Sequence, residues 1–198
     1  PYDDANVIMG QGTVGLEMLI DQPDLDVLVV PIGGGGLMSG IATIAREMRP
    51  DIRIIGVQTE SYPSMQAARL NEDMLCGGET LAEGIAVKKP GRLTLPIIVD
   101  SVDDILLVNE KQLEWAVSAL VEQQRVIAEG AGAAGIAAIY AYPELFKNLR
   151  VGVVICGGNI DPRLLSSILN RNMALDGRIS RLRISISHEP GMLAAITD

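Results

Sequence analysis

Three short runs of the chain are almost entirely apolar and rich in β-branched residues, which is typical of buried strands. The runs cover residues 27–32, 53–58 and 151–156. Strands that are apolar on both faces belong to parallel sheets with helices packed against each side. We therefore expect these three segments to lie in one parallel sheet.

Helical patterns occupy much of the sequence between these runs. A stripe of apolar residues at intervals of three and four predicts an amphipathic helix. The stripe consists of Leu113, Ala116, Val117, Leu120 and Val121. Asn109, with Gln112 three positions later, is a capping box for its first turn, and Asp161 followed by Pro162 predicts the start of another helix. The alternation of strands and helices predicts an α/β fold, a parallel sheet flanked by helices.

The pattern changes near Ala174. Asp176 and Gly177 predict a turn, and residues 182–187 then alternate between apolar and polar side chains. Such alternation predicts a strand with one exposed face, unlike the buried strands upstream. We interpret this segment as the first strand of a second module, followed by the beginning of a helix over residues 191–198.

Composition narrows the range of functions. Hydrophobic residues make up 48% of the chain, so a folded domain with a large core is expected. The net charge of −9 argues against nucleic-acid binding, because phosphates would be repelled. No apolar run reaches the roughly 18 residues that span a bilayer, and the two cysteines lack metal-ligand spacing. We expect a cytoplasmic enzyme and, since the sequence opens without Met or a signal peptide, a fragment of a longer protein.

Four consecutive glycines follow the first predicted strand and precede a helical segment over residues 37–48. The glycines are Gly33, Gly34, Gly35 and Gly36. Glycines leave the backbone N–H groups open to an approaching anion, and the dipole of the following helix favours negative charge. The segment predicts a phosphate cradle, and a neutral cradle suits an acidic protein that offers no nearby Lys or Arg.

Two other interpretations of the glycine loop remain open. The glycines could simply allow a tight turn and close packing between helix and sheet. Gly34, Gly36 and Gly40 also resemble a dinucleotide-binding spacing, and Glu60 follows the next strand, where such folds place a ribose-binding acid. A nicotinamide-dependent oxidoreductase is therefore an alternative function.

A second glycine-containing turn, residues 156–161, follows the third predicted strand. Ligands of parallel sheets bind at the carboxyl ends of the strands. Two such turns are best explained by one ligand between them, and the thiol of Cys156 would then project toward that ligand. Elsewhere a buried Cys would be regarded as a small hydrophobic residue.

Taken together, these segments resemble the fold-type II pyridoxal-phosphate (PLP) enzymes, and within them the threonine and serine dehydratases. The similarity covers the chain from residue 1 to about residue 173. It rests on residues 1–4 with 10–13, 33–37, 81–87, 129–133 and 156–159. The implied fold is the large PLP domain of tryptophan-synthase-β-like proteins. The resemblance assigns the PLP phosphate to backbone N–H groups of Gly33, Gly34, Gly35, Gly36 and Leu37, and the pyridine nitrogen to Cys156.

The resemblance implies a β-elimination that converts L-threonine to 2-oxobutanoate and ammonia, with conversion of L-serine to pyruvate as a further activity. The family's Schiff-base lysine belongs to a Ser-Phe-Lys motif upstream of this sequence, so no catalytic residue is assigned and the fragment alone should be inactive. Gln58 and Ser64 stand where some relatives carry acidic metal ligands, so no metal is expected. Glu129 is either a charge at a helix N-terminus or a neighbour of the cofactor.

The end of the chain resembles the first strand and turn of an ACT regulatory domain, a small α+β module that is incomplete here. The resemblance divides the chain into the catalytic-domain part, residues 1–174, a linker, 175–180, and the truncated module, 181–198. It implies an amino-acid effector and a homo-oligomer. An ordinary strand–turn–helix connection is the simpler alternative, and a non-catalytic amino-acid-sensing module is the alternative for the whole protein.

Overall fold

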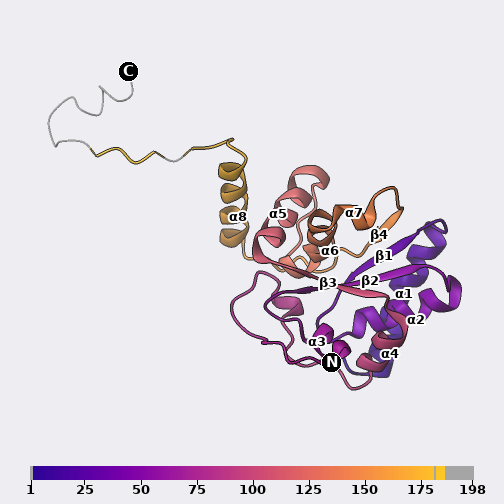
Figure 1. Cartoon of the computed structure of the whole chain (residues 1–198). Coiled ribbons are helices and arrows are strands. Elements are labelled where there is room, and N and C mark those ends of the chain that lie inside the picture. The colour runs from indigo at the N-terminus through magenta and orange to yellow at the C-terminus, as the bar shows by residue number, and fades with distance from the viewer. Residues whose placement is uncertain (1, 181, 186–198) are drawn as a thin grey trace.

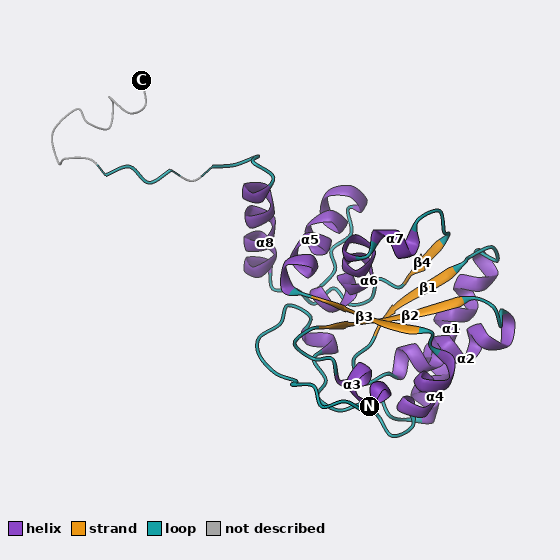
Figure 2. Ribbon diagram, in the orientation of Figure 1, coloured by secondary structure: helices purple, strands orange, loops and turns teal. Residues whose placement is uncertain are grey.

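Four parallel strands form one sheet at the centre of the computed structural model (Figure 2). The structure describes residues 2–180 and 182–185. The spatial order of the strands is β3-β2-β1-β4, and each neighbouring pair is parallel. The strands are β1 (Val27–Pro31), β2 (Arg53–Thr59), β3 (Asp104–Val108) and β4 (Val151–Val153).

Helices cover both faces of the sheet, which makes a three-layer α/β fold (Figure 1). One layer contains α1 (Ala5–Asp21), α2 (Gly36–Met48), α3 (Ser64–Leu70) and α4 (Thr94–Ser101). The opposite layer contains α5 (Glu110–Ala119), α6 (Gly130–Ala141), α7 (Pro143–Phe146) and α8 (Pro162–Leu175). A 3-10 turn spans Glu83–Ile85, and a π-helical turn over Leu120–Gln124 extends α5.

Successive side chains of β1 point into two separate hydrophobic cores. Val27 and Val29 pack with α5 and α6, whereas Leu28 and Val30 pack with α1, α2 and α4. All four are fully buried. Alternation of side chains across a strand explains why a sheet covered on both sides needs apolar residues at every position. The predicted fold class is confirmed.

The starts of three helices agree with the sequence prediction to within one residue. Asn109 and Gln112 form the predicted capping box of α5, with the Asn109 side chain accepting from the N–H of Gln112 at 3.1 Å. Asp161 is the N-cap of α8, and its carboxylate accepts from the N–H of Arg163 at 2.8 Å. The predicted helix over residues 37–48 begins one residue earlier, at Gly36.

Two strands differ from the prediction. The third predicted strand is only three residues long; β4 pairs with β1 alone, and its valines Val151 and Val153 are only half-buried. Beyond the N–H of Val154, which still donates to Val29 O at 3.1 Å, the chain leaves the sheet. Strand β3 was not predicted, because its five residues begin with the exposed Asp104 and are too few to show a clear period.

The segment after α8 follows the prediction only in part. Asp176 and Gly177 form the expected turn, with φ of +71° at Gly177. Residues 182–185 carry no helix or strand. The remainder of the predicted ACT-like strand, its turn and the following helix lie outside the described residues, so the domain division stays a prediction. Within residues 2–180, no helix has the length and apolar character needed to cross a membrane.

Candidate functional site

The two glycine-containing turns lie at the same edge of the sheet. Strands β1 and β4 are direct parallel neighbours, with Val27 opposite Val151 and Val29 opposite Val153. The chain therefore leaves both strands in the same direction, toward residues 33–36 on one and 156–159 on the other. This is the arrangement that one ligand between the two turns requires.

The glycine loop presents a row of backbone donors without partners. Among the described residues, the six N–H groups of residues 33–38 donate no hydrogen bond, and α2 has no side-chain cap. Gly34, Gly35 and Gly36 are nevertheless buried. Buried N–H groups are nearly always paired in proteins. Six consecutive free donors at a helix N-terminus therefore fit an anion such as a phosphate group.

Close packing also requires glycine in this loop. A Cβ atom at Gly34 would overlap the aromatic ring of Tyr2. Gly35 adopts φ of +99°, and a Cβ atom there would lie 2.8 Å from the side chains of Met65 and Thr94. The phosphate cradle and the packing role are thus compatible. The same glycines allow tight packing on one side and leave their N–H groups free for an anion.

Gly40, the last glycine of the dinucleotide-like spacing, has a packing role. A Cβ atom at Gly40 would collide with the backbone of α1 at Ile8 and Gly12. Glu60 lies just beyond β2 and is exposed. Gly40 therefore allows the backbones of α1 and α2 to approach each other closely.

Cys156 lies in the turn after β4 and is half-buried. Burial raises the pKa of its thiol, and the negative charge of Glu129 raises that pKa further. Both effects disfavour the thiolate. At neutral pH the group is therefore a neutral thiol, able to make a weak hydrogen bond but carrying no charge.

Glu129 takes one of the two roles that the sequence left open, a position at a helix N-terminus, and its proximity to the cofactor stays a prediction. It is the N-cap residue of α6, although its side chain does not cap the helix. Its backbone N–H donates to Gly157 O at 3.2 Å. Its carboxylate fills the space between Gly157 and Gly84, at 2.9 Å from the Cβ position of Gly84. No described residue donates a hydrogen bond to this carboxylate.

Four of the segments that carried the family resemblance meet at this edge of the sheet, namely residues 33–37, 81–87, 129–133 and 156–159. The backbone of Gly84 and Ile85 approaches Gly33, where a Cβ atom would lie 3.1 Å from Ile85 Cα. A Cβ atom at Gly132, in the first turn of α6, would overlap the carbonyl of Cys156. Residues distant in sequence thus lie close together beside the β1 and β4 turns.

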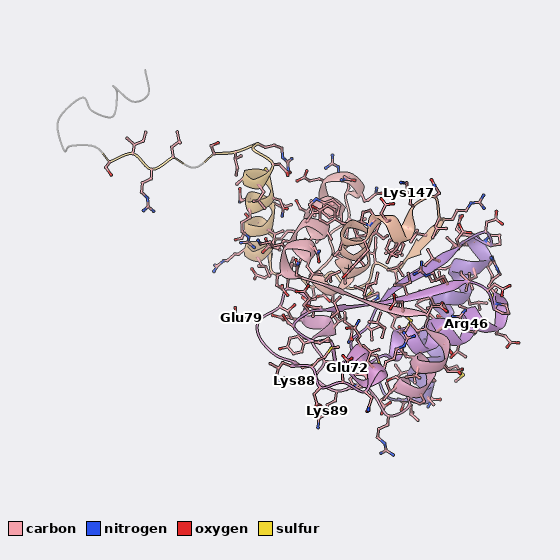
Figure 3. The ribbon with its side chains drawn as sticks, in the orientation of Figure 1. Arg46, Glu72, Glu79, Lys88, Lys89 and Lys147 are labelled. Atoms are coloured by element: carbon pink, nitrogen blue, oxygen red, sulfur yellow. The ribbon has the colours of Figure 1, made fainter. Side chains whose placement is uncertain are left out.

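The four lysines are solvent-exposed, as the sequence predicted, and Gln58 and Ser64 bind neighbouring backbone groups. Lys88, Lys89 and Lys147 are exposed (Figure 3), and so is Lys111. Gln58 is fully buried, and its side-chain oxygen accepts from the N–H groups of Met65 and Gln66 at the start of α3. Ser64 Oγ donates to Val87 O at 2.6 Å. Within the described residues, no three His, Cys, Asp or Glu side chains gather as a metal site.

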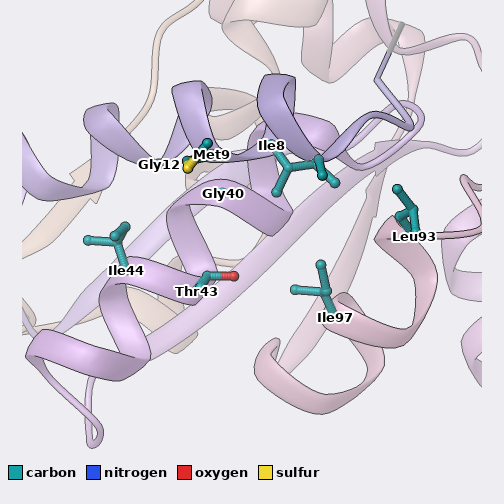
Figure 4. Close-up of a pocket in the computed structure, with 9 residues that line it drawn as sticks. Ile8, Met9, Gly12, Gly40, Thr43, Ile44, Leu93 and Ile97 are labelled. Atoms are coloured by element: carbon teal, nitrogen blue, oxygen red, sulfur yellow. The ribbon is translucent and has the colours of Figure 1, made fainter.

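An apolar hollow of about 350 Å³ lies on the opposite side of α2, between α1, α2 and α4 (Figure 4). Its lining includes Ile8, Met9, Ile44 and Ile97 and carries no charged side chain. Its lining includes no residue of the two glycine-containing turns, so it is separate from the candidate site.

Over most of its length, the chain is similar in sequence and in structure to known proteins. The L-threonine ammonia-lyase of Thermotoga maritima is 45% identical over 195 residues, which are 98% of this chain and 48% of that protein. The processed form of threonine deaminase isoform 2 from Solanum lycopersicum has a TM-score of 0.79 and 32% identity, covering 85% of this chain and 47% of that chain. Maize serine racemase has a TM-score of 0.74 and 32% identity, covering 84% and 53%.

The chain thus spans about half the length of the relatives that it matches. The family described as "Pyridoxal-phosphate dependent enzyme" matches residues 1–157. This match decides between the two phosphate-containing ligands that the sequence left open, in favour of PLP over a nicotinamide dinucleotide. The chain belongs to the pyridoxal-phosphate dependent enzyme family.

Proposed function

We propose that this chain is the cofactor-binding part of an L-threonine ammonia-lyase, which releases ammonia from L-threonine and leaves 2-oxobutanoate. The observation that carries the proposal is the row of six unpaired N–H groups at residues 33–38, beside a turn that holds a neutral thiol. The names of the relatives, an L-threonine ammonia-lyase and a threonine deaminase, support this substrate.

The backbone N–H groups of residues 33–37 are proposed to hold the phosphate of PLP. These N–H groups and the α2 dipole supply positive potential without a positively charged side chain. This suits a chain with a net charge of −9, because the phosphate is recognised locally while the rest of the surface remains acidic.

Cys156 is proposed to face the pyridine nitrogen. PLP, when bound, supplies an electron sink next to the reacting carbon of the substrate. A neutral thiol cannot hold a proton on the ring nitrogen as firmly as a carboxylate would, so the sink stays weak. A weak sink favours loss of the β-hydroxyl group over reactions that need a long-lived carbanion.

L-Serine is proposed as a second substrate, with pyruvate as its product. Serine differs from threonine by one methyl group, and a single methyl group gives a pocket little power to discriminate. The likeness to maize serine racemase supports acceptance of serine-sized substrates.

We also propose a cytoplasmic homo-oligomer with an amino-acid effector bound to its ACT-like end. Helix α1 exposes Met9 and Ile20, which are 70% and 62% accessible, and a second copy would cover them. The effector rests on the residue pattern over 181–193. The match to the Thermotoga maritima protein supports it by extending over 98% of this chain, into that end.

Spectroscopy on the product of the complete reading frame tests the cofactor. An absorbance band in the visible blue that disappears on borohydride reduction is expected from PLP linked to a lysine. Incubation with L-threonine should then release ammonia and 2-oxobutanoate in equal amounts. Nicotinamide binding without that band would overturn the cofactor, and the band without ammonia release would overturn the lyase activity.

A further inference from the structure

Two donors from a distant part of the chain hold one carbonyl group of the glycine loop. The carbonyl oxygen of Gly34 accepts from the hydroxyl of Thr94 at 2.6 Å and from the N–H of Gly91 at 3.2 Å. Thr94 is fully buried and lies at the first residue of α4. Its hydroxyl contacts no reacting group, so its effect must pass through the peptide that it holds.

Because the peptide bond is planar, the hydrogen bonds to Gly34 O also determine the direction of the Gly35 N–H. In a planar trans peptide, the C=O of one residue and the N–H of the next point in opposite directions. Fixing the oxygen of Gly34 therefore fixes the direction of the N–H of Gly35. That N–H points away from Thr94 and has no partner among the described residues. Without the two donors, the peptide between two glycines would have great rotational freedom.

Thr94 is itself held in place from two directions. The hydroxyl of Ser39, on α2, donates to the backbone oxygen of Thr94 at 3.4 Å. The carboxylate of Asp3 accepts from the N–H groups of Arg92 and Leu93 at 2.9 and 2.7 Å, immediately before α4. Asp3 thus fixes the backbone that leads into α4, a helix without a side-chain cap of its own.

We propose that Thr94 is a positioning residue for phosphate, whose hydroxyl orients the Gly34–Gly35 peptide so that the Gly35 N–H faces the anion. The inference rests on the proposed PLP site and adds to it the side chain that prepares the cradle before the ligand arrives. Preorganised donors bind more tightly because ordering them costs nothing at the moment of binding.

The test compares PLP with pyridoxal, which lacks the phosphate, in the product of the complete reading frame. Thr94→Val keeps the shape of the side chain and removes the hydroxyl. It should weaken PLP binding about tenfold, as loss of one well-placed hydrogen bond predicts, while pyridoxal binding stays unchanged. Thr94→Ser restores the hydroxyl and should stay within about twofold of wild type.

Thr43→Val is the matched control, because Thr43 Oγ1 donates only to Ser39 O, within α2, at 2.8 Å. It should bind PLP and pyridoxal as wild type does. Asp3→Asn provides a second variant that does not depend on the folding of Thr94→Val. It loosens the segment that carries Thr94 and should weaken PLP binding about threefold, again without affecting pyridoxal.

Inorganic phosphate, added to protein freed of PLP, separates this inference from the proposed function. Equal PLP affinity in wild type and Thr94→Val, or equal weakening of PLP and pyridoxal, would overturn the role of Thr94 and leave the PLP site standing. A wild type that binds no PLP, with phosphate binding weakened about tenfold by Thr94→Val, would overturn the cofactor and support Thr94. Binding of neither ligand would overturn both.

Discussion

The carboxylate of Glu129 occupies the space that a Cβ atom at Gly157 would need. Gly157 has φ of +79°, a conformation that favours glycine, and a Cβ atom there would also have to displace the Glu129 carboxylate. The same carboxylate reaches Gly84 on the other side. A single acidic side chain thus joins the segment over residues 81–87 to the turn that contains Cys156.

Replacing Gly157 should therefore destabilise the protein more than backbone strain alone explains. Gly157→Ala is expected to lower the free energy of unfolding by about 2 kcal/mol, since it adds a collision to an unfavourable φ. Gly177→Ala is the control, because Gly177 has φ of +71° with nothing within 4 Å of its Cβ position. It should cost about 1 kcal/mol. Urea unfolding of both variants measures the difference, and equal losses would contradict the collision.

The charge of Glu129 should control the reactivity of Cys156. Because burial and this charge both raise the pKa of the thiol, Glu129→Gln removes the second effect and lowers that pKa. More thiolate is then present at mildly alkaline pH, and alkylation by iodoacetamide should be faster. Mass spectrometry can follow Cys156 with Cys76 as an internal reference. An unchanged rate at Cys156, or equal acceleration at both cysteines, would exclude the electrostatic contact.

An added charge in the glycine loop should remove the cofactor. Gly34→Asp places a side chain against Tyr2 and brings a carboxylate near the unpaired N–H groups, where it competes with phosphate and repels it. We expect essentially no PLP to remain after dialysis, as measured by absorbance. Gly10→Asp adds the same charge on α1, where nothing lies within 4 Å of the Cβ position, and should keep its PLP. Normal PLP content in Gly34→Asp would place the phosphate elsewhere.

The contact between Asp3 and the start of α4 should depend on pH. Hydrogen bonds from backbone N–H groups, that of Leu93 first, hold the pKa of the Asp3 carboxyl below its usual value. A carboxyl with a lowered pKa stabilises the folded state above its usual pKa, about 4 for Asp, and loses this effect as the pH falls through the lowered value.

Asp3→Asn should consequently be less stable than wild type at neutral pH and should approach wild type in acid. Chemical unfolding at several pH values measures the gap between the two proteins. Asp4→Asn is not a suitable control, because Asp4 caps α1. Asp51→Asn, on an exposed turn, serves instead. A gap between wild type and Asp3→Asn that stays constant from neutral to acidic pH would contradict the lowered pKa.

Much of the fold was encoded locally. The apolar run over residues 27–32 predicts a buried strand because its own residues leave no polar face. Asn109 and Asp161 predict helix starts because each caps an N–H only two or three positions away. The glycine loop and Cys156 could be identified as one candidate site for a similar reason, since both follow predicted parallel strands and such strands end at one edge.

Other features depend on contacts that no sequence window contains. Thr94 meets Gly34 across 60 positions, and Asp3 meets Leu93 across 90. The pairing of β4 with β1 joins segments far apart in the chain, and the place of Glu129 against Gly157 requires α6 to begin beside the β4 turn. The sequence by itself determined the elements and the chemistry of their turns, because those follow from neighbouring side chains. Only the tertiary structure decided which residues orient that chemistry, because orientation arises where distant segments pack together.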